Sequence, residues 1–175
     1  NVCTATELIV GATCTYQTFT TLDALNSPLP DPGCGDYDGG DVWFKVVVPA
    51  GGALIFDTEE GQITDGGMAI YSGSCGNLTL IDCDDDGSNN GAMPSITTGG
   101  LIPGDTIWVR MWEYGNDGNG TFGICVTIPP PGPVNDDPCG AIELPVAANC
   151  SFQTFTNAGA YGTSSVPDPG CADYG

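Results

Sequence analysis

The sequence contains no histidine and almost no positive charge. Lys45 and Arg110 are its only basic residues, whereas 17 Asp and 5 Glu bring the formal net charge of the 175-residue chain to −20. Nucleic-acid binding needs many Lys and Arg residues to neutralise phosphates, and anionic membranes attract basic segments. The composition therefore argues against nucleic acids and anionic membrane surfaces as partners. The lack of histidine also removes the commonest general base.

Long apolar runs and helical periodicity are missing as well. The most apolar stretch, residues 46–56, is interrupted by Pro49, Gly51 and Gly52, so we expect no membrane insertion. No segment repeats apolar residues at the helical period of 3.6, whereas 27 Gly and 14 Pro separate short apolar runs. This composition is typical of an all-β protein that is rich in turns.

Cysteine is abundant, but its spacing does not suit a metal site. The chain has nine cysteines and no CxxC pair. Without paired spacing or histidine, zinc is disfavoured, and disulfides formed outside a reducing cytoplasm are the better interpretation. We therefore expect an extracellular or cell-surface protein.

The chain repeats its own beginning after 136 residues. Cys3 corresponds to Cys139 and Cys14 to Cys150, residues 17–20 recur unchanged as 153–156, and residues 30–34 recur as 167–171 after one insertion. Residues 129–136 between the copies are rich in proline, which favours a stiff, extended spacer. The sequence thus predicts a complete β-sandwich repeat over 1–128, a linker over 129–136 and the start of a second, incomplete repeat over 137–175.

Two explanations remain open for residues 137–175. The segment is too short to bury a core of its own. Either it belongs to a longer array of repeats, or it packs on a neighbouring unit and donates edge strands to it. In both cases neighbouring copies of the repeat are the expected partners.

Eight short apolar runs bounded by Gly, Asp, Asn and Pro predict strands. They lie at residues 16–20, 42–48, 53–58, 67–72, 78–83, 94–98, 106–112 and 121–128. This number and spacing predict an all-β fold, a jelly-roll-like antiparallel β-sandwich of about eight strands that is linked by disulfides.

Side-chain alternation in the last strand suggests one disulfide, and elimination suggests the others. Residues Phe122, Ile124, Val126 and Ile128 share the core face, so Cys125 points outward. We expect the N-terminal segment to cross that outer face. The predicted pairs are then Cys3–Cys125, Cys14–Cys34 and Cys75–Cys83.

The pair Cys75–Cys83 meets a geometric objection. If residues 67–72 and 78–83 form a hairpin, Cys75 lies at the turn and Cys83 lies about 16 Å away, at roughly 3.3 Å per residue. A disulfide needs Cα atoms within about 7 Å. Six cysteines allow 15 pairings, so the connectivity stays open.

Four segments carry a resemblance to a known family. They are residues 41–50 with Trp43 and Phe44, residues 69–76 with Cys75, residues 83–86, and residues 103–110 with Trp108. In this order they resemble the secreted bacterial β-sandwich modules related to the pre-peptidase C-terminal domain, which recur in tandem in surface and exported proteins of bacteria that use type IX secretion. The resemblance implies a jelly-roll-like, often calcium-dependent, non-catalytic extracellular module.

One acidic loop is a candidate calcium site. Asp82, Asp84, Asp85 and Asp86 are crowded together, and the predicted hairpin brings Asp65 to the same end. Converging oxygen ligands suit Ca²⁺, and crowded carboxylates repel one another unless a cation or proton intervenes. The alternative is a solvated acidic loop.

A second acidic loop contains Asp36, Asp38 and Asp41. Here calcium binding and ordinary turn chemistry explain the residues equally well. A third loop, residues 116–120, is predicted to be a hairpin turn because Asn-Gly and Asp-Gly favour tight turns.

The segment 106–112 contains an aromatic stripe. Its aliphatic residues Ile107, Val109 and Met111 face the core, which places Trp108, Arg110 and Trp112 on the outer face. Tryptophans beside a guanidinium could stack on sugars or contact a protein. The alternative, which we favour, is that the N-terminal segment or a neighbouring module covers them.

The chain has few residues that suit catalysis, because it has no histidine and only two basic residues. A paired-carboxylate glycosidase would need a buried acid, whereas the acidic residues lie in Gly-rich loops. The sequence therefore predicts a non-catalytic, calcium-stabilised extracellular repeat module that assembles head to tail into a surface fibre. The alternative is a carbohydrate- or surface-binding, adhesin-type module with glycans as partners, which would require an open Trp108–Trp112 face.

Overall fold

The structure, a computed structural model, describes residues 1–135 and 138–160. The chain forms two compact units, residues 1–128 and 129–175. The second copy of the Pro-Asp-Pro-Gly-Cys motif, with Cys171, lies outside the described residues.

The first unit is built almost entirely from strands. These are β1 (Thr6–Glu7), β2 (Val10–Gly11), β3 (Gln17–Thr20), β4 (Val42–Val47), β5 (Leu54–Glu60), β6 (Gly66–Ser74), β7 (Asn77–Asp84), β8 (Ser95–Thr98), β9 (Thr106–Glu113) and β10 (Thr121–Thr127). Two 3₁₀ turns accompany them, η1 (Val2–Thr4) and η2 (Tyr114–Asn116). Among the residues described, no helix is long and apolar enough to cross a membrane.

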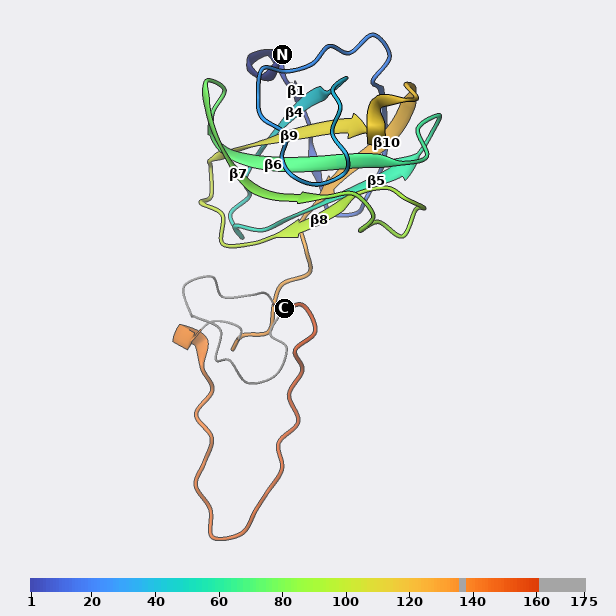
Figure 1. The fold of residues 1–175 in the computed structure, drawn as a ribbon. Coiled ribbons are helices and arrows are strands. Elements are labelled where there is room, and N and C mark those ends of the chain that lie inside the picture. The colour runs from blue at the N-terminus through green and yellow to red at the C-terminus, as the bar shows by residue number, and fades with distance from the viewer. Residues whose placement is uncertain (136–137, 161–175) are drawn as a thin grey trace. The chain divides into compact units, whose positions relative to one another are not determined.

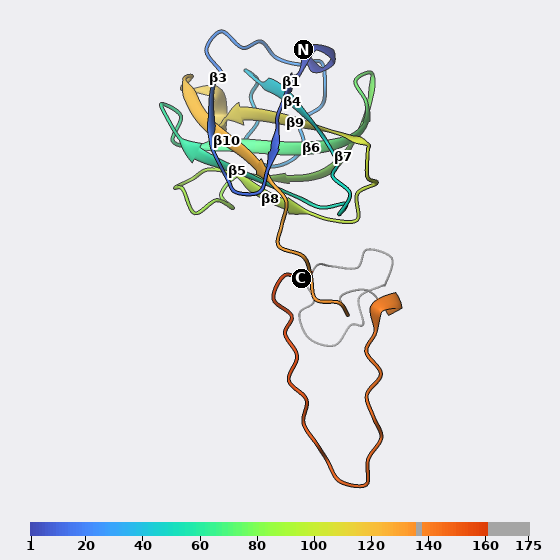
Figure 2. The ribbon, with the colours of Figure 1, turned by 180° about the vertical axis from the view of Figure 1, so that it is seen from behind.

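The strands form two sheets that face each other (Figures 1 and 2). The first sheet has the order β1-β4-β9-β6-β7, and the second has the order β2-β10-β5-β8, with β3 also paired to β10. The all-β sandwich prediction is confirmed, and each of the eight predicted runs contains a strand.

The two additional strands make the sheets mixed. β1 pairs in parallel with β4, and β2 pairs in parallel with β10, whereas the remaining pairings are antiparallel. The prediction of an antiparallel sandwich of about eight strands holds for β3 to β10, and the structure adds the two short parallel strands β1 and β2. Strands of two residues carry no side-chain alternation, so sequence periodicity cannot reveal them.

The main core lies between the sheets. It contains 17 buried residues, among them Phe44, Phe56 and Met68. Strand alternation places them there: the predicted inward sets of β9 and β10 are buried, although Ile128 lies beyond the end of β10 and is 46% exposed. Because the core takes the inward face of each strand, a binding site can use only the outward faces.

A second, smaller cluster lies on the outer face of the first sheet. Val2, Trp43, Ala69, Tyr71 and Trp112 are buried in it. The N-terminal turn η1 and the long connection between β3 and β4 supply its cover, because Leu29, Cys34 and Tyr37 pack against it as well. The first sheet is therefore covered on both faces.

The second unit contains one described turn, η3 (Pro138–Gly140). Residues 141–156 follow it without an assigned strand. Most of these residues are exposed, which sets this unit apart from the first.

Candidate functional site

The predicted aromatic stripe does lie on the outer face of β9, but the chain itself covers it. Arg110 and Trp112 are completely buried, and Trp108 is partly buried. The Trp112 indole N–H donates to the Gly35 carbonyl at 2.7 Å. These residues are therefore covered, as we favoured from the sequence, and the cover comes from η1 and the β3–β4 connection of the same chain. The alternative of an open sugar-binding platform does not fit this burial.

Arg110 lies at the centre of this covered face. Its Nε donates to Asp41 Oδ2 at 2.5 Å, and its Nη1 donates to the Pro30 carbonyl at 2.9 Å. The guanidinium carbon also lies 3.9 Å from the centre of the Tyr37 ring and 5.5 Å from that of Trp43. Arg110 and Trp112 thus hold the β3–β4 connection onto the sheet, whereas the Trp108 indole N–H donates to the Gly73 carbonyl of β6 at 3.0 Å.

Asp41 is fully engaged in this arrangement. Its Oδ1 accepts a hydrogen bond from the Ser27 hydroxyl at 2.6 Å, and its Oδ2 accepts one from the Tyr37 hydroxyl at 3.0 Å as well as the one from Arg110. Burial is the largest single effect and lowers the pKa of Arg110. The charge and hydrogen bond of Asp41, together with Tyr71 and Tyr37, outweigh burial, so the pKa of Arg110 is raised. Asp41 is therefore the counter-ion of Arg110, whereas Asp36 and Asp38 are both exposed on the same loop.

Three disulfides tie the covering segments to the sandwich, and their pairing differs from all three predictions. Cys3 bonds to Cys75, Cys14 to Cys125 and Cys34 to Cys83, with Cα–Cα distances of 5.1, 5.4 and 6.2 Å. The predicted pairs Cys3–Cys125, Cys14–Cys34 and Cys75–Cys83 were wrong.

The reasons for the corrections are geometric. Cys125 does face outward and the N-terminal segment does cross there, but the connection between β2 and β3 brings Cys14 to it. Cys75 occupies the turn of the β6–β7 hairpin, whereas Cys83 pairs with Ala69 far along it. Each therefore bonds to a covering segment, Cys75 to η1 and Cys83 to the β3–β4 connection.

The predicted calcium residues separate into two groups. Asp84 stabilises its own loop, because its Oδ2 accepts the backbone N–H groups of Gly87 at 2.7 Å and Ser95 at 2.9 Å. Asp82 Oδ1 accepts the N–H of Cys83 at 2.9 Å. These two carboxylates have structural partners within the protein.

Asp65, Asp85 and Asp86 form the second group. Burial raises the pKa of Asp65, and the charges of Asp86, Asp85 and Asp117 raise it further. The loop at residues 116–120, which the sequence predicts only as a hairpin turn, thus adds a fourth carboxylate, that of Asp117. Oxygen donors of this kind suit Ca²⁺. In the described part of the chain, however, no three of these carboxylates lie within 4.8 Å of one another.

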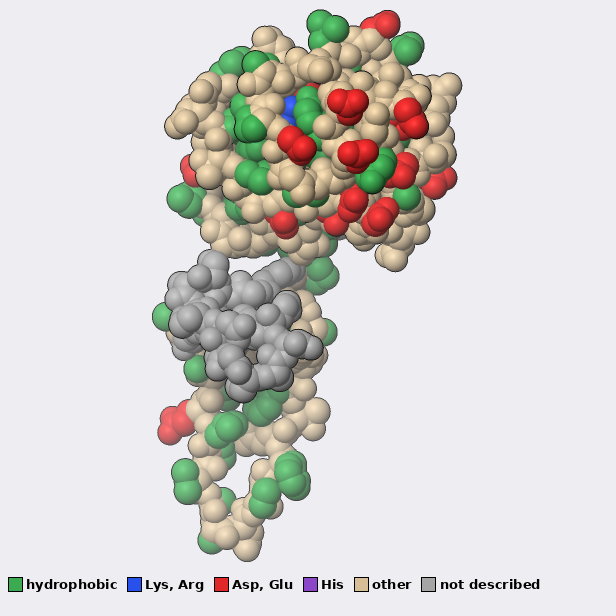
Figure 3. Space-filling view, viewed as in Figure 1, with side chains coloured by type: hydrophobic (Ala, Val, Ile, Leu, Met, Phe, Trp, Pro, Cys, Tyr) green, Lys and Arg blue, Asp and Glu red, His purple; other side chains and the backbone are tan. Residues whose placement is uncertain are grey.

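Acidic side chains are also numerous on part of the surface of the first unit. Figure 3 shows Asp and Glu side chains gathered on one side of the sandwich. Like charges at this density repel one another, which a bound cation or a lower pH would relieve.

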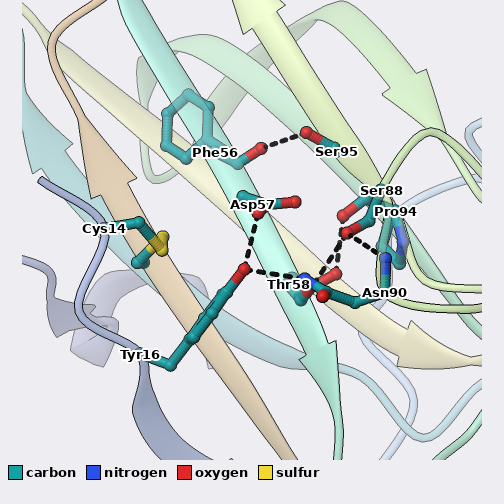
Figure 4. The surroundings of a disulfide bond; sticks show 10 residues. Cys14, Tyr16, Phe56, Asp57, Thr58, Ser88, Asn90, Pro94 and Ser95 are labelled. Atoms are coloured by element: carbon teal, nitrogen blue, oxygen red, sulfur yellow. Dashed lines mark hydrogen bonds between the residues drawn. A yellow bond between two sulfur atoms is a disulfide. The ribbon is translucent and has the colours of Figure 1, made fainter.

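Sequence reasoning missed a polar cluster beside the Cys14–Cys125 disulfide (Figure 4). The Tyr16 hydroxyl donates to Asp57 Oδ2 at 2.6 Å and accepts from Asn90 Nδ2 at 2.7 Å. Burial and the hydrogen bond to Asp57 raise the pKa of Tyr16 to about 12. Asp57 lies within 4.8 Å of both sulfur atoms, but these form a disulfide and cannot act as thiolate ligands.

The alternation of β5 was the available signal for this cluster. Leu54 and Phe56 face the core, so Asp57 had to face outward. Its partner Tyr16 was not predictable, because it comes from a connection 41 residues away in the sequence.

Two carboxyl groups are buried in the described part of the chain, those of Asp41 and Glu113. Asp41 is paired with Arg110. Burial raises the pKa of Glu113, and its Oε2 accepts the N–H of Gly118 at 3.1 Å, which opposes the rise. Asp41 holds the β3–β4 connection and Glu113 holds the loop at Gly118. The neighbouring carboxyl group of Asp117 also raises the pKa of Glu113.

A groove of about 780 Å³ lies on the first unit. It lies between η1, the loop that contains Leu25 and Asn26, the start of β4 with Trp43, and the β6–β7 turn at Gly76. Leu25 is 83% exposed there. The groove combines apolar and amide or hydroxyl groups, which are the usual lining of a ligand site.

Comparisons with known proteins do not identify a family. No protein-family model and no curated protein sequence matches this chain. Among solved structures it is similar to the pre-peptidase C-terminal domain of collagenase from Bacillus anthracis, with a TM-score of 0.44 and 11% identity over 70% of this chain and 93% of that chain. It is also similar to PliG of Aeromonas hydrophila, a periplasmic inhibitor of g-type lysozyme, with a TM-score of 0.43 and 10% identity over 70% of this chain and 94% of that chain. Similarities of this size establish neither family membership nor function.

Proposed function

We propose that the chain is a non-catalytic, calcium-stabilised structural module of an extracellular tandem-repeat protein that assembles head to tail. The three disulfides support a location outside a reducing cytoplasm. The structural roles of the buried carboxyl groups support a non-catalytic module.

The observation that carries this proposal is that the second unit repeats the local structure of the first. The turn η1 (Val2–Thr4) recurs 136 residues later as η3 (Pro138–Gly140). After β3, the backbone N–H of Leu22 donates to Thr20 Oγ1 at 3.0 Å, and the N–H of Ala158 donates to Thr156 Oγ1 at the same distance.

The next residues of this turn also correspond. The backbone bond from Ala24 to Thr21 has its counterpart from Ala160 to Asn157, at 2.9 and 3.0 Å. Asp23 and its equivalent Gly159 both adopt positive φ, 61° and 77°. Two segments that share sequence and local conformation are what a tandem array contains.

The calcium part of the proposal is supported by the crowding of Asp65 with Asp85, Asp86 and Asp117. A cation bound only by the native state raises the free energy of unfolding. We expect the melting temperature to rise by several degrees in millimolar CaCl₂ relative to EGTA, measured by circular dichroism. An identical melting temperature in both buffers would remove calcium from the proposal.

Asp65→Asn tests which residues respond to calcium. The variant removes one of the mutually repelling charges, so in EGTA it should melt at or above the wild-type temperature, and its shift with calcium should be much smaller. Asp105→Asn is the matched control, because Asp105 is an exposed carboxylate on a different loop. If both variants keep the wild-type calcium shift, the ion binds elsewhere.

Assembly is tested separately from calcium. Negative-stain microscopy of the concentrated protein should show linear particles, whereas isolated single particles at all concentrations would contradict head-to-tail assembly. The adhesin-type alternative would use the groove at Leu25 and Trp43, and specific binding on a glycan array, abolished by Leu25→Asp, would favour it.

A further inference from the structure

We propose that residues 146–156 of one chain can replace β2 and β3 on strand β10 of a second copy, as donated strands. The proposal rests on the head-to-tail assembly proposed above and names the surface and the partner that would carry it. Donated strands gain main-chain hydrogen bonds from a sheet edge and specificity from pockets for alternate side chains.

The receiving surface is the edge of β10. β3 pairs with it antiparallel, from Thr121 opposite Thr20 to Ile124 opposite Gln17, and β2 pairs with it in parallel at Val126 and Thr127. The whole of β3, Gln-Thr-Phe-Thr, recurs without change at residues 153–156. The donor therefore carries the same β3 sequence that β10 already accepts, and at the positions of β2 it carries Val146-Ala147 in place of Val10-Gly11.

The apolar contacts of this surface are also matched. The Phe19 ring lies 4.7 Å from that of Phe44 and 6.4 Å from that of Phe122, between centroids. Phe155 is the equivalent of Phe19 and is 48% exposed. Val146 is the equivalent of Val10, which packs against the core, and Val146 is fully exposed.

The donor segment has no sheet of its own, and the turn that follows it has the same local form as the turn after β3. It has no assigned strand between residues 141 and 156, yet the turn that follows β3 is reproduced at 156–160. An apolar strand sequence exposed in this way is prone to add to a matching sheet edge.

A cysteine marks the register of the proposed contact. In the first unit Cys14 bonds to Cys125 of β10, which is only 3% exposed. Cys150 is the equivalent of Cys14, and it is an exposed free thiol. If residues 146–156 dock in register, Cys150 of one chain lies against Cys125 of the other.

The experiment uses the full chain with Cys14→Ser, which leaves Cys125 without its partner. Equal amounts of unlabelled and ¹⁵N-labelled protein are unfolded, reduced and refolded together at high concentration with oxidised glutathione. Two thiols lose two electrons and two protons as the bond forms, and oxidised glutathione accepts them and is reduced. We expect a Cys150–Cys125 disulfide between chains, with about half of the linked peptides combining the two isotopes.

Two variants separate docking from random thiol oxidation. Cys14→Ser with Cys150→Ser should form no such dimer. Cys14→Ser with Phe155→Asp keeps every thiol but loses the apolar anchor, so the yield of the linked peptide should fall about tenfold. Equal yields with and without the Phe155→Asp substitution would show that the thiols meet by random collision, which would overturn the proposal. A mixed disulfide of Cys150 with glutathione, with Cys125 left reduced, would overturn it as well.

The unmodified chain provides a measurement that does not depend on the variant's folding. Refolded in the same way, it should show a smaller Cys150–Cys125 fraction that grows with protein concentration, and its complete absence at every concentration would overturn the proposal. Linear particles without this cross-link would leave head-to-tail assembly standing and exclude strand donation as its contact. Unlinked single particles would contradict both.

Discussion

Arg110 and Asp41 form a buried ion pair, with Nε and Oδ2 2.5 Å apart, although 69 residues separate them in the sequence. Both side chains are almost completely inaccessible to solvent. The pair joins a central strand of the first sheet to the end of the connection that covers it. Arg110 and Trp112 of the aromatic stripe therefore attach the β3–β4 connection to the sheet.

Removing one partner of this pair should be costly. Asp41→Asn keeps the shape of the side chain but leaves the Arg110 charge buried without a counter-ion, so we expect the free energy of unfolding to fall by about 3–5 kcal/mol. Urea denaturation followed by tryptophan fluorescence measures this change. Glu7→Gln is the control, because the Glu7–Lys45 pair is exposed and 3.8 Å long, and its loss should cost less than about 1 kcal/mol. Equal losses in both variants would contradict the role assigned to Asp41.

The disulfide pairing can be checked with a single protease. Trypsin cleaves after Lys45 and Arg110 only, which divides the chain into residues 1–45, 46–110 and 111–175. Cys3–Cys75 and Cys34–Cys83 join the first two peptides, and Cys14–Cys125 joins the first to the third. We therefore expect one linked species in a non-reduced, denatured digest and three peptides after reduction. Release of 46–110 without a reductant would contradict the pairing and favour a Cys75–Cys83 bond.

Gly67 tests how tightly the covered face is packed. It lies opposite Trp112 in the β6–β9 ladder, and a Cβ atom there would overlap the Trp112 indole. We expect Gly67→Ala to lower the free energy of unfolding by about 1–3 kcal/mol through overpacking. Gly51→Ala is the control, since a Cβ atom at Gly51 meets nothing within 4 Å, and it should change stability by about 0.5 kcal/mol or less. A neutral Gly67→Ala would mean that Trp112 is not held in this position.

The Tyr16–Asp57 hydrogen bond predicts a loss of stability in alkali. The pKa of Tyr16 is raised from 10.0 to about 12 in the folded protein, chiefly by burial and by Asp57. The unfolded chain therefore loses the Tyr16 proton at a lower pH than the folded chain does. The stabilisation is complete below pH 10 and is lost as the pH rises to about 12.

The variant Tyr16→Phe provides the comparison. Phenylalanine already occupies the equivalent position of the second copy, as Phe152. The free energy of unfolding of the wild type should fall more steeply between pH 10 and 12 than that of the variant, measured by urea denaturation. Tyr114→Phe, at an exposed side chain, should follow the wild type. Parallel curves for the wild type and Tyr16→Phe would contradict the raised pKa.

The candidate sites show where sequence reasoning stopped. It did not group Asp117 with Asp65, Asp85 and Asp86, although Asp117 reaches the same region from a loop more than thirty residues downstream of them. It placed Arg110 on the right face of β9 but had no means of finding Asp41 above it.

By itself, the sequence determined the eight longer strands, the inward faces of β9 and β10 and the repeat register, because side-chain alternation and self-similarity are properties of the chain read in order. Only the tertiary structure decided the disulfide partners, the burial of Arg110 and Trp112, and the Tyr16–Asp57 contact. Each of these depends on where a long, Gly- and Pro-rich connection lies over a sheet. Such connections have no periodicity, so their path is set by the contacts they make with residues far away in the sequence.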